Sequence, residues 1–250
     1  MKIYELARNL FFPPRCASCK KLLEITNEGF CGEYCLCPEC RGLWQRAKLE
    51  NCPECLCPSS LCLCAPTEGK LKNIKIPKLI TYTPERNNIQ GKMIFALKRI
   101  NDKRICEFAS SELAVSLCTY FKDERVLPDS CIYTYVPRRR KAICEYGFDQ
   151  GRRLSYGLAK ACEGEFLPLF ERVGGKEQKK LDKKARETNV NHAIDLRDGY
   201  ADKVKGRTVV VVDDLITTGA TLGRAVQLLR KAGAANIYVT AVGKTCEIKK

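Results

Sequence analysis

Cysteine pairs at short spacing dominate the N-terminal part of the chain. Eleven of the seventeen cysteines lie between Cys16 and Cys64. A C-x-x-C turn supplies two thiolates from one tight loop, and a structural zinc ion takes four such ligands in a tetrahedron. Three pairs have this spacing and a fourth is one residue tighter: Cys16/Cys19, Cys37/Cys40, Cys52/Cys55 and Cys62/Cys64. The pattern predicts two structural Zn²⁺ sites, one from Cys16, Cys19, Cys37 and Cys40 and one from Cys52, Cys55, Cys62 and Cys64.

Other chemistry is compatible with all-cysteine groups. An iron–sulfur cluster or redox-active dithiols would also use soft thiolate ligands. Disulfides are not expected, because the cysteine count is odd and the first twelve residues are too short and too charged for a secretory segment. The only histidine, His192, lies far away in the sequence, so ligation by cysteine alone is expected. Cys31, Cys35 and Cys57 are surplus to the two groups, and their roles stay open.

The net charge of +15 lies entirely in the second part of the chain. Residues 1–69 contain 8 Lys and Arg against 8 Asp and Glu, and residues 70–250 contain 36 against 21. We therefore expect a zinc-binding module over 1–69 and a larger domain over 70–250. A basic domain favours an anionic partner such as a phosphate ligand or a nucleic acid. A solvated basic surface without a specific partner would show the same excess of charge.

The second part of the chain has the pattern of an α/β fold. Apolar residues alternate there between a period of two and a period of 3.6, and the run Thr208–Val212 is typical of a buried parallel strand. No apolar run approaches the ~20 residues needed to span a bilayer, so a cytoplasmic protein is expected. Strands are predicted over Leu79–Tyr82, Cys131–Val136, Thr208–Val212 and Ile237–Val242, and helices over residues 3–11, Ile89–Arg99, Ile105–Phe121, Gly151–Cys162 and Thr221–Ala232.

The run Val209–Leu222 carries the most chemical information. A buried strand delivers Asp213 and Asp214 to its C-terminal edge, where open α/β sheets place their ligands. Backbone N–H groups, hydroxyls and a helix dipole after the strand suit a phosphate, while two carboxylates suit a ribose diol or a Mg²⁺ ion that bridges diol and diphosphate. The segment predicted to bind this ligand is Leu215, Ile216, Thr217, Thr218, Gly219, Ala220 and Thr221. The pattern predicts a site for a 5-phosphoribosyl group, and the alternative is a strand end followed by a capped helix.

Two basic segments lie outside this run. Arg138–Lys141 follows a predicted strand, and Gly174–Asn189, which includes Lys179, has too little apolar surface to pack. Either segment would suit a polyanion, and a solvated surface is the alternative for both. With Lys98, Arg99, Lys103, Arg104, Arg152 and Arg153 they would also form a track for single-stranded DNA, aided by the nearby aromatic residues Tyr133, Tyr135, Tyr146 and Phe148.

Several motifs together resemble a known family. The run Val209–Leu222 resembles the diphosphate-sugar motif of type I phosphoribosyltransferases. The whole chain is similar to the ComF family, which joins an N-terminal zinc module to a domain of that type. The resemblance is carried by Phe11–Cys16, Lys98, Val136–Arg140, Tyr146–Gln150 and Gln178 with Arg186 and Asn189. Tyr146 and Asp149 depart from the Arg and Asn of the family motif, which puts a cation contact there in doubt.

The resemblance implies a function and a set of partners. It implies handling of single-stranded DNA during natural transformation, a phosphoribosyl diphosphate or nucleotide-like ligand, and a translocating helicase among the candidate partners. The alternative is an active Mg²⁺-dependent phosphoribosyltransferase acting on an unidentified base or amine. There, Asp213 and Asp214 would hold the diol, and Arg139 or Lys179 would offset charge on the leaving diphosphate. The sequence shows no base-reading pocket, so the acceptor stays open.

Overall fold

A computed structural model describes residues 13–23, 25–26, 29–30, 35–66, 70–83, 88–173 and 194–245. The strands are β1 (Ile25–Thr26), β2 (Gly29–Phe30), β3 (Lys78–Tyr82), β4 (Ile132–Tyr135), β5 (Glu165–Phe166), β6 (Phe170–Arg172), β7 (Ile194–Leu196), β8 (Thr208–Ile216) and β9 (Asn236–Thr245). The helices are α2 (Pro38–Leu49), α3 (Ile89–Arg99), α4 (Lys103–Glu124), α5 (Arg140–Tyr146), α6 (Gln150–Ala161), α8 (Ala201–Val204) and α9 (Ala220–Lys231), with 3-10 turns η1 (Ser59–Leu61) and η2 (Pro128–Ser130). Among the helices of these ranges, none combines the length and the apolar character that crossing a bilayer requires.

A five-stranded parallel sheet in the order β3-β9-β8-β4-β5 forms the centre of the molecule. Strand β8 lies in the middle, and its residues 209–212 are fully buried. Because neighbouring residues of a strand point to opposite faces, Val210 and Val212 join one core cluster and Val209 and Val211 join the other. The predicted buried parallel strand Thr208–Val212 is therefore confirmed.

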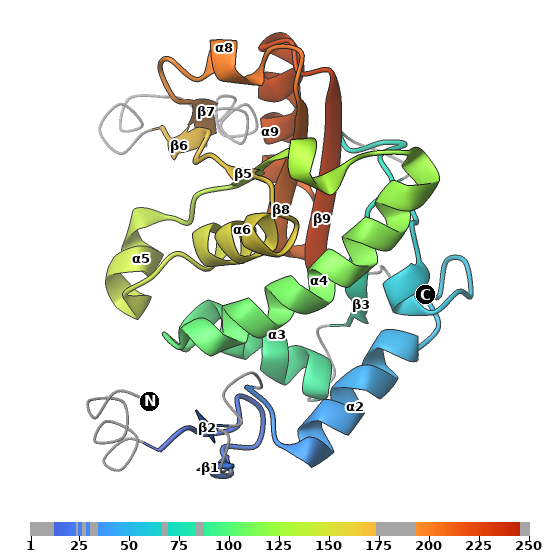
Figure 1. Cartoon of the computed structure of the whole chain (residues 1–250), viewed down its shortest axis with the longest axis vertical. Coiled ribbons are helices and arrows are strands. Elements are labelled where there is room, and N and C mark those ends of the chain that lie inside the picture. Colours follow the sequence, from blue (N-terminus) through green and yellow to red (C-terminus); the bar gives the residue numbers. More distant parts are fainter. Residues whose placement is uncertain are drawn as a thin grey trace, which may run out of the picture.

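Helices cover both faces of the sheet. Helices α3, α4 and α6 lie over one face, to which they contribute Leu97, Leu113 and Leu154 (Figure 1). Helix α9 contributes Val226 and Leu229 to the core on the other face. Two packed layers of helix around a parallel sheet are the expected way to bury strands that are apolar on both faces.

The parallel strands β4 and β8 are followed by connections that run to opposite sides of the sheet. After β4 the chain runs outward to β5, whereas after β8 it runs to β9 on the other side. The carboxyl ends of two neighbouring strands that diverge in this way form the crevice in which open α/β sheets bind ligands. The segments that follow these strands, beginning at Val136 and Thr217, border this crevice.

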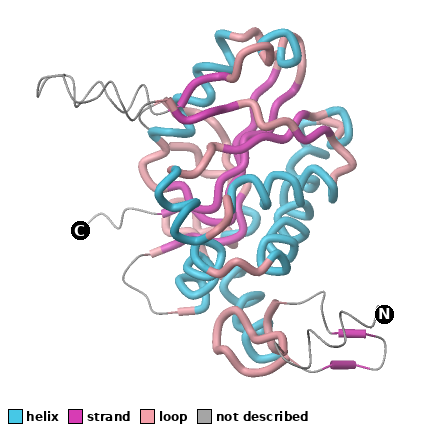
Figure 2. The backbone as a smooth tube through the Cα atoms, turned by 90° about the vertical axis from the view of Figure 1, so that its left-hand side faces the viewer, coloured by secondary structure: helices cyan, strands magenta, loops and turns pink. Residues whose placement is uncertain are grey.

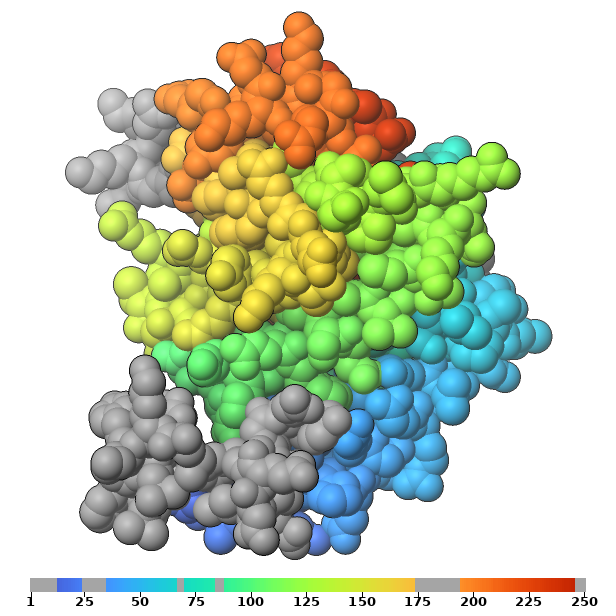
Figure 3. All heavy atoms as spheres, viewed as in Figure 1, coloured from blue at the N-terminus to red at the C-terminus, as the bar shows by residue number. Residues whose placement is uncertain are grey.

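The cysteine-rich segment packs directly on the α/β part. Helix α2 buries Trp44 completely, and the indole ring lies 6.4 Å from the ring of Phe108 in α4. Lys48 of α2 forms an ion pair with Glu112 of α4. In Figure 3 the blue residues of this segment lie against the green surface of α3 and α4, while Figure 2 shows β1 and β2 at the outer end of the molecule. One core cluster contains residues from both parts.

The predicted helices and strands of the described part are all present, but β8 is longer than predicted, and α2, α5, α8, β5, β6 and β7 were not predicted. The helix predicted over Ile89–Arg99 has the predicted bounds, and the others differ by at most three residues in the described part. No helix was predicted between the cysteines, whereas the structure has α2 there, where Pro38 starts the helix and buried Trp44 anchors it. Strand β8 continues to Ile216 because it pairs with β9 as far as Lys244. The helix predicted over 3–11 and the segment Gly174–Asn189 lie outside the described residues.

Candidate functional site

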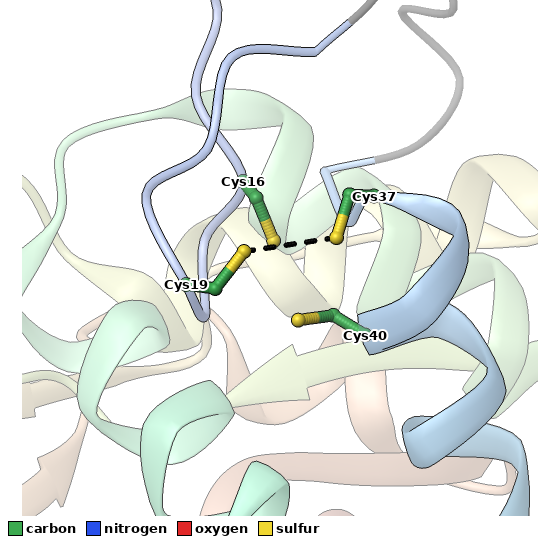
Figure 4. A group of neighbouring side chains, drawn as sticks. All are labelled: Cys16, Cys19, Cys37 and Cys40. Atoms are coloured by element: carbon green, nitrogen blue, oxygen red, sulfur yellow. Dashed lines mark hydrogen bonds between the residues drawn. The ribbon is translucent and has the colours of Figure 1, made fainter.

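The first cysteine group brings together two segments separated in sequence. The sulfur atoms of Cys16, Cys19, Cys37 and Cys40 all lie within 4.8 Å of one another, and those of Cys19 and Cys37 are 3.6 Å apart (Figure 4). Two sulfurs bound to one tetrahedral Zn²⁺ at about 2.3 Å would be separated by about 3.8 Å. The donor set and its spacing therefore fit a tetrahedral metal ion.

The environment of this group favours thiolates unequally. Burial opposes ionisation of Cys16, but the backbone N–H groups of Cys19, Cys37 and Ser18 together outweigh it and lower the pKa of this thiol to about 7. Burial raises the pKa of Cys40 to about 12, so this thiol ionises at neutral pH only with a cation beside it. Burial raises the pKa of Cys37, although this residue is the N-cap of α2, where the helix dipole stabilises negative charge.

The four cysteines of the second group lie within a shorter stretch of sequence, Cys52–Cys64. The sulfurs of Cys52, Cys55, Cys62 and Cys64 also lie within 4.8 Å of one another. The surplus cysteines of the described ranges do not join either group. Cys35 is buried, which raises the pKa of its thiol to about 12, and Cys57 is exposed. Cys31 lies outside the described residues.

The two acidic residues of β8 lie next to each other near the carboxyl end of the strand. Strand β4 ends where Tyr135 pairs with Val212, so β8 has no strand partner on that side from Asp213 onward. Asp214 is buried, accepts a hydrogen bond from Gln150 Nε2 at 3.0 Å, and lies 3.6 Å from Lys98 Nζ. The sequence predicted a carboxylate pair just after the strand, whereas the structure places both within it.

The surroundings of Asp213 disfavour the charged form of its carboxyl group. Burial and the neighbouring Asp214 carboxylate raise the pKa of Asp213 well above its usual value. Its Oδ1 accepts the backbone N–H of Asp214 at 2.8 Å. A carboxylate whose charge is poorly compensated at a sheet edge is a candidate contact for a ligand hydroxyl or cation.

The raised pKa of Asp213 leads to a prediction about pH. A raised pKa in the folded state means that Asp213 opposes folding increasingly as pH rises above the unfolded value of about 3.9. Replacing it by an isosteric neutral group, Asp213→Asn, is therefore expected to raise the melting temperature, and to do so more at pH 8 than at pH 5. Thermal unfolding at both pH values checks this, with Asp198→Asn at an exposed position as control. Equal gains at both pH values, or a loss, would contradict the raised pKa of Asp213.

The loop after β8 presents the N-terminus of α9. Thr217 and Thr218 are exposed, and Gly219 takes a left-handed conformation with φ of 66° as the N-cap. Gly219 has no side chain to cap the helix, and the hydroxyl of Thr218 accepts the N–H of Ala220 at 3.4 Å. The next N–H groups of the first turn have no acceptor within the helix, which suits a phosphate ligand. A Cβ atom at Gly219 would lie 2.6 Å from Leu71 Cδ1, so both the conformation and the space call for glycine. Ala220 and Thr221 form the first turn of α9.

Leu215 and Ile216 serve packing rather than the loop. Both are strand residues paired with β9, and Ile216 is almost fully buried in the core on the α9 side. Lys179 lies outside the described residues. The structure thus brings Lys98 to Asp214 and sets the loop from Thr217 beside them, while two of the residues predicted to bind ligand belong to the core.

The basic turn after β4 separates into two roles. Arg138 is fixed in place, since its guanidinium donates to the carbonyls of Lys98 at 2.6 Å and Phe148 at 3.3 Å. Arg139 is exposed at the crevice. Asp149, where the sequence departs from the family motif, accepts the backbone N–H of Arg138 and caps α6.

Two further residues at the crevice were missed by sequence reasoning. Gln150 opens α6 and bonds Asp214, and its Oε1 is buried without a hydrogen-bond partner within the described part. Arg172 of β6 donates to the Pro137 carbonyl at 2.8 Å, and burial together with the charge of Arg139 lowers its pKa. Gln150 is the last residue of the motif Tyr146–Gln150, but no sequence signal marked Arg172, which lies in a three-residue strand.

The cavity that the structure contains elsewhere is unrelated to this crevice. It has a volume of about 360 Å³ and is lined by residues of α2, η1, β3 and α4, including Lys48, Leu61 and Val115. None of the predicted site residues lines it. The predicted ligand site is therefore not this cavity.

Parts of this chain, or most of it, are similar in sequence to known proteins. Residues 176–249 match the phosphoribosyl transferase domain family. Competence protein ComFC of Streptococcus pneumoniae is 24% identical over 82% of this chain and 86% of its own length. DNA utilization protein YhgH of Salmonella typhimurium is 25% identical over 94% of this chain and 99% of its own. A 38-residue segment, 15% of this chain and 14% of the other protein, is 60% identical to ribose-phosphate pyrophosphokinase of Thermococcus kodakarensis.

These findings define a type I phosphoribosyltransferase-like domain, a mostly parallel sheet flanked by helices, that follows a module with two four-cysteine groups. The combination, with relatives aligned along most of the chain, fits a protein of the ComF family. The resemblance inferred from the sequence motifs is confirmed.

Proposed function

We propose that this chain is a ComF-like protein that handles single-stranded DNA during uptake or processing, through a domain that binds phosphoribosyl diphosphate or a related nucleotide. The observation that carries the proposal is the crevice at the carboxyl ends of β4 and β8. It combines Asp213 and Asp214, the N-terminus of α9 and exposed Arg139. The relatives named for competence and DNA utilization support the biological role.

The crevice has the groups that a phosphoribosyl ligand needs. The loop from Thr217 and the first turn of α9 would hold the 5′-phosphate, and the helix dipole favours its charge. Asp213 and Asp214 would hold the ribose hydroxyls directly or through Mg²⁺, which would neutralise the diphosphate. Ligand hydroxyls would replace the contacts that Asp214 makes with Gln150 and Lys98.

An arginine–aromatic row beside the crevice suits a nucleic acid strand. Arg99 lies over the rings of Phe95 and Tyr146, Arg138 lies over Tyr146 and Phe148, and Arg153 lies over Phe148, at 4.6 to 5.7 Å from the ring centres. Phe95 is half-exposed and Arg99 is exposed, so this end of the row can meet a base and a phosphate. Stacking platforms flanked by cations are the usual means of binding single strands.

The two four-cysteine groups would each hold Zn²⁺ in a structural role. All eight cysteines would bind as thiolates, the sulfurs of each group lie within 4.8 Å of one another, and a closed site with four protein ligands leaves no position for substrate. The metal would replace the hydrophobic core that a segment of this size cannot build alone.

The ligand proposal is tested by calorimetric titration with phosphoribosyl diphosphate and Mg²⁺, followed by competition with a labelled oligonucleotide. We expect saturable binding of the diphosphate, and displacement of the oligonucleotide by excess ligand. No binding of phosphoribosyl diphosphate would contradict the proposal. Single-turnover release of diphosphate with a base or an amine would instead indicate an active transferase.

The DNA proposal predicts a steep dependence on salt. Each phosphate contact with a single strand contributes about −0.7 to the slope of log affinity against log salt concentration. Arg139→Ala should therefore weaken binding of an oligonucleotide and make the slope shallower by about 0.7. Lys160→Ala, at an exposed position near the end of α6, is the control and should change neither. A slope near zero for the unmodified chain would exclude binding through phosphates.

A further inference from the structure

Two lysines of the central sheet are buried against the second cysteine group. Of the lysines in the described ranges, only Lys78 and Lys244 belong to the buried residues, with exposed fractions of 0% and 7%. They come from the adjacent strands β3 and β9. A buried ammonium group is strongly unfavourable unless an anion or several acceptors compensate it. The partners of these two lysines therefore show what charge this region holds.

Lys78 is compensated by a cysteine of the second group. Its Nζ lies 2.8 Å from Cys62 Sγ and 3.3 Å from the carbonyl oxygen of the same residue. A neutral thiol offers only a weak acceptor to an ammonium group, whereas a thiolate offers a full negative charge. The contact is therefore favourable when Cys62 is a thiolate, its form as a metal ligand.

Lys244 has a counter-ion of its own. Its Nζ lies 3.3 and 3.4 Å from the two carboxylate oxygens of Glu54 and 3.4 Å from the carbonyl oxygen of Cys64. The charges of Lys244 and Glu54 cancel. Four thiolates with one Zn²⁺ carry a net charge of −2, so Lys78 is the cation that remains to offset it.

Among the described residues, no buried lysine or arginine contacts the first cysteine group. The lysines next to it in the described part are exposed: Lys20 donates to the carbonyl of Ala17, and Lys21 pairs with Glu39. The two groups therefore have the same four ligands but differ in one buried cation. This difference provides an internal reference within a single chain.

The second group is also joined to the sheet by neutral contacts. Ser59, which lies between the two cysteine pairs in sequence and is fully buried, donates its hydroxyl to the carbonyl of Glu50 at 2.8 Å and accepts from Thr81 Oγ1 of β3 at 2.9 Å. Lys244 is the register partner of Ile216, the last residue of β8 before the loop. Lys244, which contacts Glu54 and the carbonyl of Cys64, therefore connects the second group to the strand residue that precedes the loop.

We propose that Lys78 is the charge-compensating residue of the second four-cysteine group, and that metal binding by this group is thereby coupled to formation of the β3–β9 edge of the sheet. The inference rests on the proposed occupation of both groups by Zn²⁺. Coupling of this kind is reciprocal. Metal binding stabilises the β3–β9 edge because it makes Cys62 the thiolate that compensates the charge of Lys78. In return, Lys78 strengthens metal binding because its ammonium group offsets the negative charge of the thiolates.

The test is a competition between the protein and chelators of graded strength, with Zn²⁺ and Co²⁺ as probes. The unmodified chain should bind two ions tightly. In Lys78→Met one of the two dissociation constants should rise about 10- to 100-fold, as for other outer partners of metal ligands, and the other should stay unchanged. Lys244→Met removes a buried lysine that has its own carboxylate, and should change metal affinity far less.

Thermal melting separates compensation from simple packing. Lys78→Met should melt below the unmodified chain when both hold metal, and above it after chelation, because the neutral side chain removes an uncompensated buried charge. A lost packing contact would lower the melting temperature in both states. Equal metal affinities in Lys78→Met and the unmodified chain, or no reversal in the order of melting, would overturn the inference.

A second variant covers the case in which Lys78→Met does not fold. Cys62→Ser removes the anion that Lys78 contacts, so Cys62→Ser with Lys78→Met should melt above Cys62→Ser alone. A double variant that melts lower, or does not fold, would overturn the inference. Fewer than two tightly bound ions in the unmodified chain would instead contradict the proposed zinc sites, which is a separate outcome.

Discussion

Removal of metal with a strong chelator should shift the fluorescence of Trp44 to longer wavelength and abolish the packing of α2. Trp44 is the only tryptophan of the chain and is fully buried, and its helix has Cys37 as N-cap and carries Cys40 in its first turn. Structural Zn²⁺ binds with about 10–16 kcal/mol, which is comparable to the whole stability of a domain, about 5–15 kcal/mol. Without metal, the start of α2 loses its tie to the Cys16 turn.

Matched cysteine variants assign this effect to one group. Cys19 and Cys55 are both exposed members of their groups. Cys19→Ser should shift the emission as chelation does, whereas Cys55→Ser should leave it unchanged, since Trp44 lies one turn after Cys40 in α2 and packs on Phe108 of α4. Emission that stays constant after all metal has been removed would show that α2 is held by its apolar contacts alone.

The sequence predicted those features that depend on local spacing. Cysteine pairs at short spacing indicated the two four-cysteine groups because ligand spacing is a property of a single turn. The β-branched run and the Thr-Thr-Gly turn predicted β8 and the start of α9 for the same reason. Helix α2 was missed because its apolar stripe, with Trp44 at its centre, is narrow and becomes meaningful only against α4.

Features that depend on contacts between residues distant in sequence could not be predicted from local sequence patterns. The length of β8 is set by its register with β9, which no local signal records, so Asp213 and Asp214 were expected after the strand. Arg172 and Lys78 acquire their roles from residues 33 and 16 positions away, Arg139 and Cys62. Lys78 in particular breaks the local rule that lysine is exposed, and such exceptions tend to mark functional contacts.

The second large effect is expected at the crevice. Asp213→Asn combined with Asp214→Asn should abolish the rise in melting temperature produced by phosphoribosyl diphosphate with Mg²⁺, and should leave the metal content of the two cysteine groups unchanged. Hydrogen bonds to charged groups contribute about 1.5–3 kcal/mol each, so loss of two such acceptors should weaken binding at least ~100-fold. Thermal melts with and without ligand, together with metal analysis, measure both quantities.

The charge of the variant makes this result discriminating. Neutralising two carboxylates makes the net charge of +15 more positive by two, which by itself favours any anion. If the ligand were held only by general attraction to a basic domain, the double variant would bind more tightly, as should the control Asp198→Asn with Asp202→Asn at exposed positions. Loss of binding in the first variant alone would require specific contacts from Asp213 and Asp214 to hydroxyls or Mg²⁺. Ligand-dependent stabilisation that persists in it would refute the site.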